Sequence, residues 1–469
     1  MSGISAYGAY VPYTRLPLAT IQGRPAKQGG PEKAVAYYDE DAVTMGVAAA
    51  LDCLTGFDRN AVDGVIFAST SYAMAEKQGA ALIAKALDLR RDVSTSDVAG
   101  SLRAGTNALR SAFDSVSAGS ARNLLVIASD CRMGAPRGAL ESKLGDGAVA
   151  FLVSDSHAIA TFEGSHSVAN EIQDLWRIQN DPYTHTWEDR FVVTEGYTPV
   201  IVEGVLGLFE KLGLAPGDFT KAALYAPDAR SLGGATRGIG LAKEQLQEPL
   251  FGKLGNTGCA FALMLFAHAL ETAKSGERIL VASYGDGCDA LSFQISEHIE
   301  KLGERRGMSG YLARRTAIKS YDTYLRSRSL DPKEWVAGGD PGLSATVRFR
   351  ERDADLSFVG GKCTSCGQVH FPQPRVCYQC YAKDQWEPYR LSDKPGRLLA
   401  HTFDYFFPAP EPPAIMIMAE IDGCHVQIQL ADARPEDAVL DLPVEFAFRK
   451  IHNAGGKANY FWKAVAAES

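Results

Sequence analysis

The sequence DVAGSLRAGTNALRSAFDSVSAGSARNLLVIAS, residues 97–129, decides the fold. Two small residues, Ala99 and Gly100, lead into an Ala-rich stretch that we predict to be a helix beginning at Ser101. A Gly-Ser turn follows, and then an apolar strand at residues 124–129. A helix, a tight turn and a short, continuously apolar strand are typical of an α/β fold with buried strands.

The second half of the chain contains a similar unit at residues 255–283, GNTGCAFALMLFAHALETAKSGERILVAS. The helix is expected from Cys259 and the strand ends at Ser283, so these points lie 24 positions apart, against 28 in the first unit. Two such units indicate a duplicated α/β fold. Any α/β protein repeats helix, turn and strand, so chance similarity is the alternative.

Other segments alternate in the same way along the first 300 residues. Apolar strands are expected at residues 64–68 (GVIFA) and 148–153 (AVAFLV), and residues 41–54 form an Ala-rich helical stretch. Strands without a polar face are buried on both sides. We therefore expect an α/β sheet whose strands are largely parallel.

Charge and apolar content narrow the classes of function. The 48 basic and 56 acidic side chains give a formal net charge of −8, which argues against a nucleic-acid-binding surface. The N-terminus lacks the basic start and apolar stretch of a secretory signal, and the longest apolar run, residues 259–270, is too short to span a bilayer. The nine cysteines fit a reducing compartment. We therefore expect a cytoplasmic protein that binds neither nucleic acid nor a membrane.

The chain is long enough for two or three domains. Residues 301–329 are rich in Arg, Lys and Tyr and predict an exposed helical segment, and the Gly-rich residues 337–342 (AGGDPG) predict a linker. Beyond them, short strands and Pro-rich turns indicate a small β-domain. The predicted divisions are a first domain at residues 1–335, with halves at about 1–160 and 161–300, and a second domain at 345–469.

A cysteine pattern identifies a metal site in the second domain. The sequence CTSCGQVHFPQPRVCYQC contains two CxxC knuckles, and Gly367 suits the tight turn of the first. Four thiolates at this spacing can surround Zn²⁺ tetrahedrally in a closed, structural site. Iron in a rubredoxin-like site is the alternative that spacing leaves open. The predicted ligands of this ribbon, at about residues 360–392, are Cys363, Cys366, Cys377 and Cys380.

The predicted helix start at Ser101 is a candidate catalytic feature. Small residues flank it at Ala99, Gly100, Ala104 and Gly105. A buried helix start offers free N–H groups and a partial positive charge, which suit an oxyanion or a developing enolate. The alternative is close helix packing by small residues.

Several motifs, in the same order, give the chain a family resemblance. The first ~330 residues resemble hydroxymethylglutaryl-CoA synthase and its ketoacyl synthase III relatives in the thiolase superfamily. The last ~120 resemble the rubredoxin-like zinc ribbon and OB-fold domain that accompanies many thiolase-like enzymes and is thought to hold or bridge acyl-CoA. The matching pieces of the first part are GISAYGAYVP (3–12), DVAGSLRAGTNAL (97–109), LGDGAVAFLVSD (144–155), DLWR (174–177), APDAR (226–230), GNTG (255–258) and SYGDG (283–287).

The resemblance implies a duplicated five-layer thiolase-like fold, a homodimer and an acyl-CoA thioester as ligand. The OB-fold's oligonucleotide-binding name does not imply nucleic acid here. The family's nucleophilic cysteine falls on Ser101, its histidine on Tyr225, and its glutamate near Thr70 or Ser71. The asparagine of the GNTG motif is retained as Asn256. The oxyanion framework therefore resembles the family, while the acyl-transfer residues differ.

These differences favour chemistry without a covalent acyl group. A serine hydroxyl needs an activating base, and tyrosine, with an ordinary pKa of about 10, is a poor one near neutrality. Donors near Ser101, Asn256 and the backbone near Gly285 suit a thioester enolate, and Tyr225 suits proton exchange with a β-hydroxyl. We therefore expect aldol addition or retro-aldol cleavage of a β-hydroxyacyl-CoA, as the resemblance to thiolase-like aldolases implies. Two alternatives are an acyl-transferring condensing synthase and a non-catalytic acyl-CoA-binding subunit beside an active thiolase.

Each position also has a purely structural interpretation, without a catalytic role. Ser101 could be an inert small residue at a tight turn, Tyr225 a buried filler, and Asn256 a cap of the helix from Cys259. The basic run that includes Arg305 and Arg306 either contacts CoA phosphates or forms a solvated helix face. The remaining candidates are pocket-lining or core residues, Cys288, Tyr197 and His185.

Overall fold

The computed structural model describes residues 2–178, 181–328, 345–407, 409–454 and 457–467. The chain divides into two compact units. Unit 1 comprises Met1–Ala36, Asp41–Ala84 and Leu89–Tyr321, and unit 2 comprises Tyr37–Glu40, Lys85–Asp88 and Asp322–Ser469. The expected linker at 337–342, and the expected first-domain limit at 335, lie outside the described residues.

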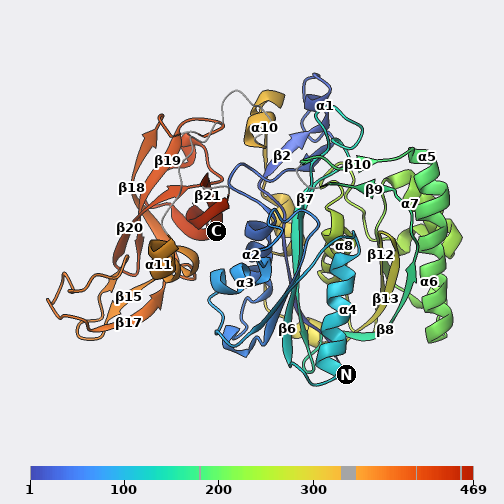
Figure 1. Cartoon of the computed structure of the whole chain (residues 1–469), viewed down its shortest axis with the longest axis horizontal. Coiled ribbons are helices and arrows are strands. Elements are labelled where there is room, and N and C mark those ends of the chain that lie inside the picture. The colour runs from blue at the N-terminus through green and yellow to red at the C-terminus, as the bar shows by residue number, and fades with distance from the viewer. Residues whose placement is uncertain (1, 179–180, 329–344, 408, 455–456, 468–469) are drawn as a thin grey trace. The chain divides into compact units, whose positions relative to one another are not determined.

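A nine-stranded sheet forms the centre of unit 1, in the order β11-β12-β13-β8-β1-β7-β6-β4-β5 (Figure 1). Its strands are β1 (Gly3–Tyr10), β4 (Gly64–Ala68), β5 (Ser94–Val98), β6 (Asn123–Cys131), β7 (Asp146–Ser154), β8 (Ala160–Ala169), β11 (Lys221–Leu224), β12 (Arg278–Tyr284) and β13 (Gly287–Ile295). Two small sheets accompany it, β14-β2-β3 and β10-β9. Their strands are β2 (Thr14–Pro17), β3 (Glu32–Ala34), β9 (Leu175–Trp176), β10 (His185–Thr186) and β14 (Thr316–Ala317).

Strand pairing repeats between the two halves of the sheet. In the first half β4 is parallel to β6, which continues antiparallel to β7 and then β1. In the second half β11 is parallel to β12, which continues antiparallel to β13 and then β8. The expected duplication is therefore visible in the topology. The expectation of largely parallel strands is wrong, because β12 and β13 are joined by the two-residue turn Gly285-Asp286, which forces an antiparallel hairpin.

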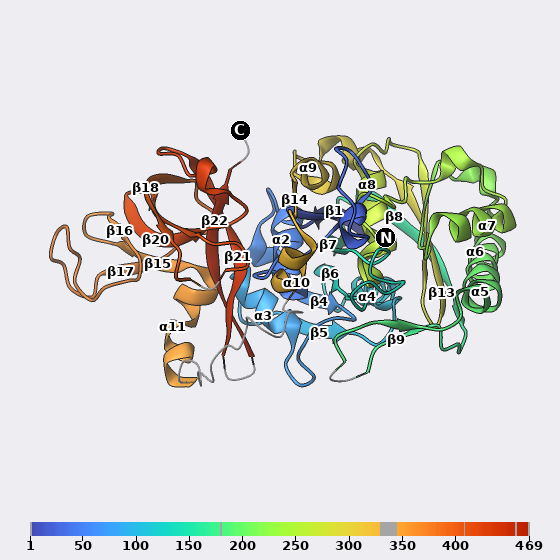
Figure 2. The same cartoon turned by 90° about the horizontal axis from the view of Figure 1, so that it is seen from above.

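Helices and the two half-sheets form five layers. Helix α2 contacts β1, β6 and β7, while α6 contacts β8 and β13 and packs on α7. Helix α4 contacts β4 and β6, and α8 contacts β11 and β12, so these two lie between the half-sheets. Figures 1 and 2 show α6 and α7 together on the side of β8 and β13 that faces away from α2. The helices are α2 (Ala42–Cys53), α3 (Gly79–Ala86), α4 (Ala104–Ser117), α6 (Thr198–Leu212), α7 (Ala229–Ile239) and α8 (Phe261–Leu270).

Local sequence explains where these helices begin and end. Asp41 caps α2, since its Oδ1 accepts from the N–H groups of Val43 (2.9 Å) and Thr44 (3.0 Å). Gly213, with φ 65°, ends α6 in the left-handed conformation. Among the described residues, the short helices of unit 1 are α1 (Leu18–Ile21), α5 (Asp189–Phe191), a π-helical turn (Val192–Tyr197), α9 (Gly307–Ala313) and five 3₁₀ turns (Arg59–Ala61, Pro216–Asp218, Lys243–Gln245, Gly258–Ala260 and Glu297–Lys301).

One helical run is long and apolar enough to cross a membrane by length and composition, Val192–Leu212, with a mean hydropathy of 1.3. Half of its most apolar window is buried inside the protein, where α6 packs on β8 and β13. A buried core helix passes the same test, so this run does not indicate a membrane span.

Unit 2 consists of a zinc-ribbon sheet and a closed five-stranded barrel, preceded by α10 (Tyr321–Ser327) and α11 (Ala345–Ser357). In β20 alternate side chains are buried, as a barrel wall requires. The ribbon strands are β15 (Val359–Cys363), β16 (Val369–His370) and β17 (Trp386–Arg390). The barrel strands are β18 (Gly396–Asp404), β19 (Ala414–Ile421), β20 (Cys424–Leu430), β21 (Pro443–Ala454) and β22 (Lys457–Ala466).

Candidate functional site

Tyr225 follows β11 directly and is 1% exposed. Three aromatic rings surround it, with centroid distances of 6.4 Å to Tyr197, 6.1 Å to Tyr284 and 5.8 Å to Phe261. Burial raises the pKa of Tyr225, and nearby Arg132 opposes the rise only in part. At neutral pH the side chain is therefore a phenol that can donate a hydrogen bond, and it is a poor base.

Asn256 lies beside Tyr225 in the turn that leads to α8. Its Nδ2 donates to the backbone oxygen of Ala226 (3.2 Å), which ties it to the segment after β11. Its Oδ1 accepts from the N–H of Gly258 (3.0 Å) and from Arg132 Nη2 (2.9 Å). Asn256 is therefore both a turn residue and part of a buried polar cluster with Tyr225 and Arg132.

Arg132 was missed by sequence reasoning. It follows β6, and it is 6% exposed at the point where β6 reaches the turn before α8. The available signal was an arginine directly after a buried strand, because a charged side chain there is either solvated or paired. Its partner Asn256 is 124 positions away, which no local pattern reveals.

The neighbouring Asp130 is also buried and is saturated with hydrogen bonds. Its carboxylate accepts from Thr70 N–H (2.7 Å), Thr70 Oγ1 (2.9 Å) and Ser71 Oγ (2.9 Å). Ser69 Oγ (3.2 Å) and the N–H of Cys259 (2.8 Å) donate to it as well. Thr70 and Ser71, the positions expected for the family's glutamate, thus serve as donors to a carboxylate instead of supplying one.

Ser101 lies in the turn before α4, which begins at Ala104 and not at Ser101 as expected. The cause is a pair of hydrogen bonds from Arg103 to a turn that is distant in the sequence. Arg103 Nε donates to the backbone oxygen of Gly285 (2.6 Å), and Arg103 Nη2 donates to the backbone oxygen of Asp286 (2.9 Å). Ser101 Oγ also donates to Gly285 O (2.9 Å). Ser101 Oγ also accepts from the N–H of Arg103 (3.3 Å), and within the described residues no hydrogen bond leads from Ser101 to Tyr225 or Asn256.

Gly285 allows two chain segments to approach closely. A Cβ there would lie 2.7 Å from Leu102 Cβ and 2.9 Å from Leu102 N. The N–H of Gly285 donates to Gly287 O (3.0 Å), so in this structure it is not free to polarise a thioester as expected.

Asp174 is a second buried acid near Tyr225, and its catalytic potential was also missed. Burial raises the pKa of Asp174, outweighing its contact with Tyr284 and the N–H of Leu175, which donates at 2.6 Å. Its charge in turn raises the pKa of Tyr225. The signal in the sequence was its place in the DLWR motif.

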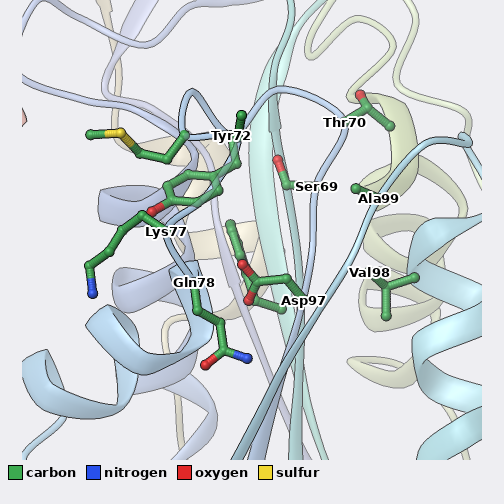
Figure 3. A pocket seen from close by; sticks show the side chains of 11 residues that line it. Ser69, Thr70, Tyr72, Lys77, Gln78, Asp97, Val98 and Ala99 are labelled. Atoms are coloured by element: carbon green, nitrogen blue, oxygen red, sulfur yellow. The ribbon is translucent and has the colours of Figure 1, made fainter. Parts of the chain in front are cut away.

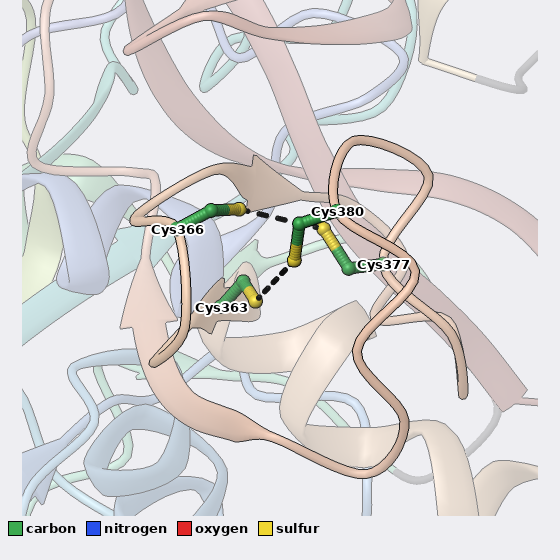
Figure 4. A group of neighbouring side chains, drawn as sticks. All are labelled: Cys363, Cys366, Cys377 and Cys380. Carbon is green, nitrogen blue, oxygen red and sulfur yellow. Dashed lines mark hydrogen bonds between the residues drawn. The ribbon is translucent and has the colours of Figure 1, made fainter.

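The four cysteines of unit 2 converge as expected, with all four Sγ atoms within 4.8 Å of one another (Figure 4). Two Sγ pairs, Cys363 with Cys380 and Cys366 with Cys377, are each 3.7 Å apart. Tetrahedral thiolates at Zn–S bonds of about 2.3 Å lie ~3.8 Å apart, so the set fits zinc. His370 Nε2 lies 3.4 Å from Cys377 Sγ, where it can support the ligand.

Comparison with known proteins identifies the family. A hydroxymethylglutaryl-CoA synthase of Aeropyrum pernix is 35% identical over 341 residues, which cover 70% of this chain and 94% of that protein. The chain belongs to the hydroxymethylglutaryl-CoA synthase family. Residues 350–387 match a family model described as "ChsH2, rubredoxin-like zinc ribbon domain". The predicted fusion of a synthase-like part with a zinc ribbon is confirmed.

Solved structures confirm the fold. "Crystal structure of HMG_CoA synthase complexed with CoA" has a TM-score of 0.64 at 19% identity and covers 73% of this chain and 94% of its own. "MvaS in complex with 3-hydroxy-3-methylglutaryl coenzyme A" has a TM-score of 0.62 at 22% identity and covers 73% and 95%. The curated relatives are synthases, so they support the condensing alternative and give no support to the aldolase preference.

Arg305 and Arg306 of this family member are engaged by other groups. Arg305 Nη1 donates to the oxygen of Tyr7 (2.6 Å), and the N–H of Arg306 donates to Asp52 Oδ1 (3.0 Å). Both arginines line a cavity of about 450 Å³, and three glutamates form another part of its lining. Carboxylates there repel a phosphate. The assignment of Arg305 and Arg306 to CoA phosphates stays a prediction. The three acids are Glu271, Glu300 and Glu304.

The remaining candidates have structural contacts. Cys288 is fully buried against α6, and burial raises the pKa of its thiol. Tyr197 donates its hydroxyl to Tyr225 O (2.8 Å) and so positions the residue after β11. His185 Nε2 lies 2.6 Å from Asp181 Oδ2.

A cavity of about 290 Å³ adjoins the Asp130 cluster (Figure 3). Ser69 and Thr70, which donate to Asp130, form part of its wall. Figure 3 shows Tyr72 and Lys77 on one side of it and Ala99 on the other. The cavity therefore adjoins the residues that donate to Asp130, while Tyr225, Asn256 and Arg132 are not among its lining residues.

Proposed function

We propose that this chain is a condensing enzyme of the hydroxymethylglutaryl-CoA synthase type, which forms a carbon–carbon bond next to an acyl-CoA thioester. Family membership across 94% of the Aeropyrum protein supports this class of reaction. The observation that carries the proposal is the buried cluster of Tyr225, Asn256 and Arg132, where three hydrogen-bonding side chains meet at the ends of β11 and β6.

The condensation begins at the donor thioester. Its α-C–H bond breaks, the proton passes to a base, and the carbon's electron pair forms the new bond to the carbonyl carbon of the acceptor. The acceptor's carbonyl oxygen becomes an alkoxide and takes up a proton, which gives a β-hydroxyacyl thioester. Asp174 suits the base, since a carboxylate with a raised pKa accepts protons better near neutrality. The Tyr225 phenol suits hydrogen bonding to the alkoxide.

In this proposal the donor acyl group stays on CoA and Ser101 carries no acyl group. The Ser101 hydroxyl donates to Gly285 O, and a serine nucleophile needs a base in hydrogen-bond contact. Retro-aldol cleavage by Tyr225 would start from a phenolate, which the raised pKa disfavours. The contacts of both residues thus favour condensation without a covalent intermediate.

The zinc ion would be held by the four cysteines of the ribbon in a closed, structural site. Coenzyme A would enter as part of the substrate. We also infer a homodimer in the cytoplasm. Strand β5 supports the dimer, because it is an edge of the sheet with Ser94, Ser96 and Asp97 exposed. Sedimentation equilibrium checks the dimer, and fractionation of the source cells checks the location.

The direct test uses the full-length, zinc-loaded protein with acetyl-CoA and a panel of ketone and aldehyde acceptors that includes acetoacetyl-CoA. Mass spectrometry should detect an adduct with the summed mass of donor and acceptor, or that mass after hydrolysis of one thioester. Intact-protein mass should show no acyl adduct. An adduct that disappears in Ser101→Ala would overturn the non-covalent route, and absence of product with every acceptor would overturn the condensing function.

A second candidate is a non-catalytic acyl-CoA-binding subunit beside an active thiolase. Among the residues that the structure describes, no base forms a hydrogen bond with Ser101 Oγ, and Tyr225 is a neutral phenol; both observations favour this candidate. It predicts no turnover by the protein alone and turnover when a thiolase is added. Activity of the complex should then survive Tyr225→Phe and be lost when the thiolase's own nucleophile is removed.

A further inference from the structure

A cavity of about 810 Å³ lies beside helix α7 in unit 1. This volume is within the range of about 300–1,000 Å³ that is usual for sites of small organic ligands. One wall is a single face of α7, on which lining residues recur at helical spacing. The segment 241–249 supplies a second wall, and its Gln247 N–H donates to Ala222 O of β11 (3.0 Å). The lining residues of α7 are Ala229, Leu232, Gly233, Thr236 and Arg237.

Much of the lining of this cavity is apolar. Leu232 of α7 and Leu241 and Leu246 of the second wall all border it. Apolar side chains at a cavity surface gain free energy when a hydrocarbon chain replaces water there. Gly233 keeps the space open: among the described residues outside the helix backbone, a Cβ there would meet Arg237 Nη1 alone within 4 Å, at 3.8 Å.

Three cations line the same cavity without a carboxylate partner. In the described part of the chain, no ion pair joins Lys221, Arg237 or Lys243 to an acidic side chain. The acidic residue of the lining, Glu248, pairs with Lys253 at 2.7 Å. This local excess of positive charge occurs in a chain whose formal net charge is −8. The lining therefore favours an anion.

The three cations lie at one end of the cavity. Lys221 begins β11, and its Nζ donates at 3.1 Å to a backbone oxygen of the turn Lys243–Gln245. The end of α7 lies there as well, because a Cβ on Gly240 would be 3.5 Å from Pro216 Cγ, in the turn before β11. Arg237 belongs to this last turn of α7.

The end of α7 favours a ligand with a single negative charge. Gly240, at φ 85°, ends the helix beside the cations, and the C-terminal end of a helix has a partial negative charge. A doubly charged phosphate would be repelled more strongly there than a carboxylate. Ala229 and Leu232, nearer the start of α7, line the part of the cavity away from the cations and suit an apolar chain.

We propose that this cavity binds a long-chain carboxylate, with the head group at Lys221, Arg237 and Lys243 and the hydrocarbon chain along α7. Burial of the chain supplies affinity, while the cations supply orientation and the preference for an anion. The inference does not depend on the proposed condensation, because none of the residues assigned to that reaction lines the cavity.

Isothermal titration calorimetry with the full-length, zinc-loaded protein tests the ligand class. Decanoate should bind about tenfold more tightly than decanol, which has the same chain without the charge, and more tightly than decyl phosphate. From octanoate to dodecanoate, each added CH₂ should tighten binding about two- to fourfold. A wild-type protein that does not bind decanoate, or binds decanol or decyl phosphate as tightly, would overturn the proposal.

Two neighbouring glycines of α7 provide a matched pair of variants that locates the site. Gly233→Leu should fill the cavity and weaken decanoate binding about tenfold. Gly234 does not line the cavity, and among the described residues a Cβ there meets nothing within 4 Å, so Gly234→Leu should leave binding unchanged. Both variants replace a helical glycine with a strong helix former, so α7 should stay folded. Equal decanoate binding in the two variants would show that the ligand binds elsewhere.

Arg237→Gln and Lys243→Gln test the contacts of the head group. Each should reduce the preference for decanoate over decanol about threefold. Arg230→Gln is the control, since Arg230 is exposed on α7 and does not line the cavity, and it should keep the full preference. An unchanged preference in the double variant Arg237→Gln, Lys243→Gln would contradict the proposed position of the carboxylate.

Discussion

The protonation state of Tyr225 determines what this site can do. Its ring is enclosed by Tyr197, Tyr284 and Phe261, and the charge of Asp174 adds to the effect of burial on its pKa. Arg132 and Asn256 lie beside Tyr225 in the polar cluster, but the phenol stays neutral. A neutral, buried phenol is a strong, preorganised hydrogen-bond donor to an oxygen that gains charge. Tyr225, at the position expected for the family's histidine, is therefore better suited to stabilise a developing negative charge than to abstract a proton.

Tyr225→Phe should lower kcat of condensation by about 10²-fold with little change in KM, because it removes one donor to the developing charge and keeps the ring. Steady-state kinetics measures both constants. Tyr197→Phe is the control. In the described part of the chain the Tyr197 hydroxyl donates to Tyr225 O, so its loss should cost about 1 kcal/mol of stability and change kcat a few-fold at most. Equal kcat values in wild type and Tyr225→Phe would contradict the role of the phenol.

Asp174 should set the acid limb of the pH–rate profile. A base must be ionised, so kcat/KM should fall as pH decreases through the raised pKa of Asp174, above the value of about 4 for an ordinary aspartate. Asp286 contributes to this rise, so Asp286→Asn should move the limb to lower pH. Asp174→Asn should remove most of the activity. A limb that stays in place in Asp286→Asn would contradict the assignment.

Part of this site was visible in the sequence. Tyr225 and Asn256 were predicted together, and the structure places them in one cluster. Arg132 was not, because its partner is 124 positions away. The helix start at Ser101 was misplaced because Arg103 binds the turn at Gly285, 182 positions away, and holds residues 101–103 outside the helix. Local propensity cannot show such contacts.

At the scale of elements, the predicted strands at residues 64–68, 124–129 and 148–153 all fall within observed strands, β4, β6 and β7. Continuous apolar runs identified them because both faces of the sheet are covered. Their direction was not predictable from the runs themselves. The short Gly285-Asp286 turn contained that information, since two residues can join only antiparallel neighbours.

The zinc ribbon is an element whose stability depends on its metal. Gly367 (φ 81°) and Tyr381 (φ 62°) occupy equivalent places after the first and second CxxC pairs, and their N–H groups donate to Cys363 O (2.8 Å) and Cys377 O (3.0 Å). Tyr378 and Tyr381 are exposed, so they add little to a core. An element with so few buried side chains needs the four thiolate bonds to stay folded.

Cys377→Ser should abolish the binding of one zinc per chain and unfold β15, β16 and β17, because three thiolates hold the metal poorly. Metal analysis measures the stoichiometry, and amide hydrogen exchange measures protection of the ribbon. Cys424→Ser is the matched control, since Cys424 is a buried cysteine of the barrel outside the cluster and should leave zinc binding intact. One zinc per chain in Cys377→Ser would contradict the four-cysteine assignment.

At the scale of the whole molecule, unit 2 includes a short segment from the first part of the chain, Tyr37–Glu40. Within unit 2, Asp39 Oδ2 pairs with Lys463 Nζ at 2.9 Å, and Glu40 pairs with Arg449. All four side chains are at most 4% exposed. The predicted divisions assigned residues 37–40 to the first domain, because partners more than 400 positions apart leave no mark on local composition.

Such buried pairs make unit 2 sensitive to the loss of either partner. Lys463→Met should destabilise unit 2 by about 3–5 kcal/mol, because the buried carboxylate of Asp39 loses its direct ion-pair partner. The double variant Asp39→Leu, Lys463→Met should recover much of this loss. The control Arg397→Met removes an exposed pair with Glu420 and should cost about 0–1 kcal/mol. Urea unfolding followed by fluorescence, to which the buried Trp462 of β22 contributes, measures each value.

The same pair predicts the pH range in which unit 2 is stable. Lys463 and Arg449 outweigh the effect of burial and hold the pKa of Asp39 below its usual value, while Asp39 outweighs burial and raises that of Lys463. The contribution of Asp39 is therefore fully present above its unfolded pKa of about 4 and is lost as pH falls below it. That of Lys463 is present below about 10.4 and is lost as pH rises beyond its folded value. Unfolding free energies across pH 3–11 should thus decline at both ends in the wild type, and the declines should be smaller in the double variant. Equal declines in the two proteins would show that other groups control the acid and alkaline limits of unit 2.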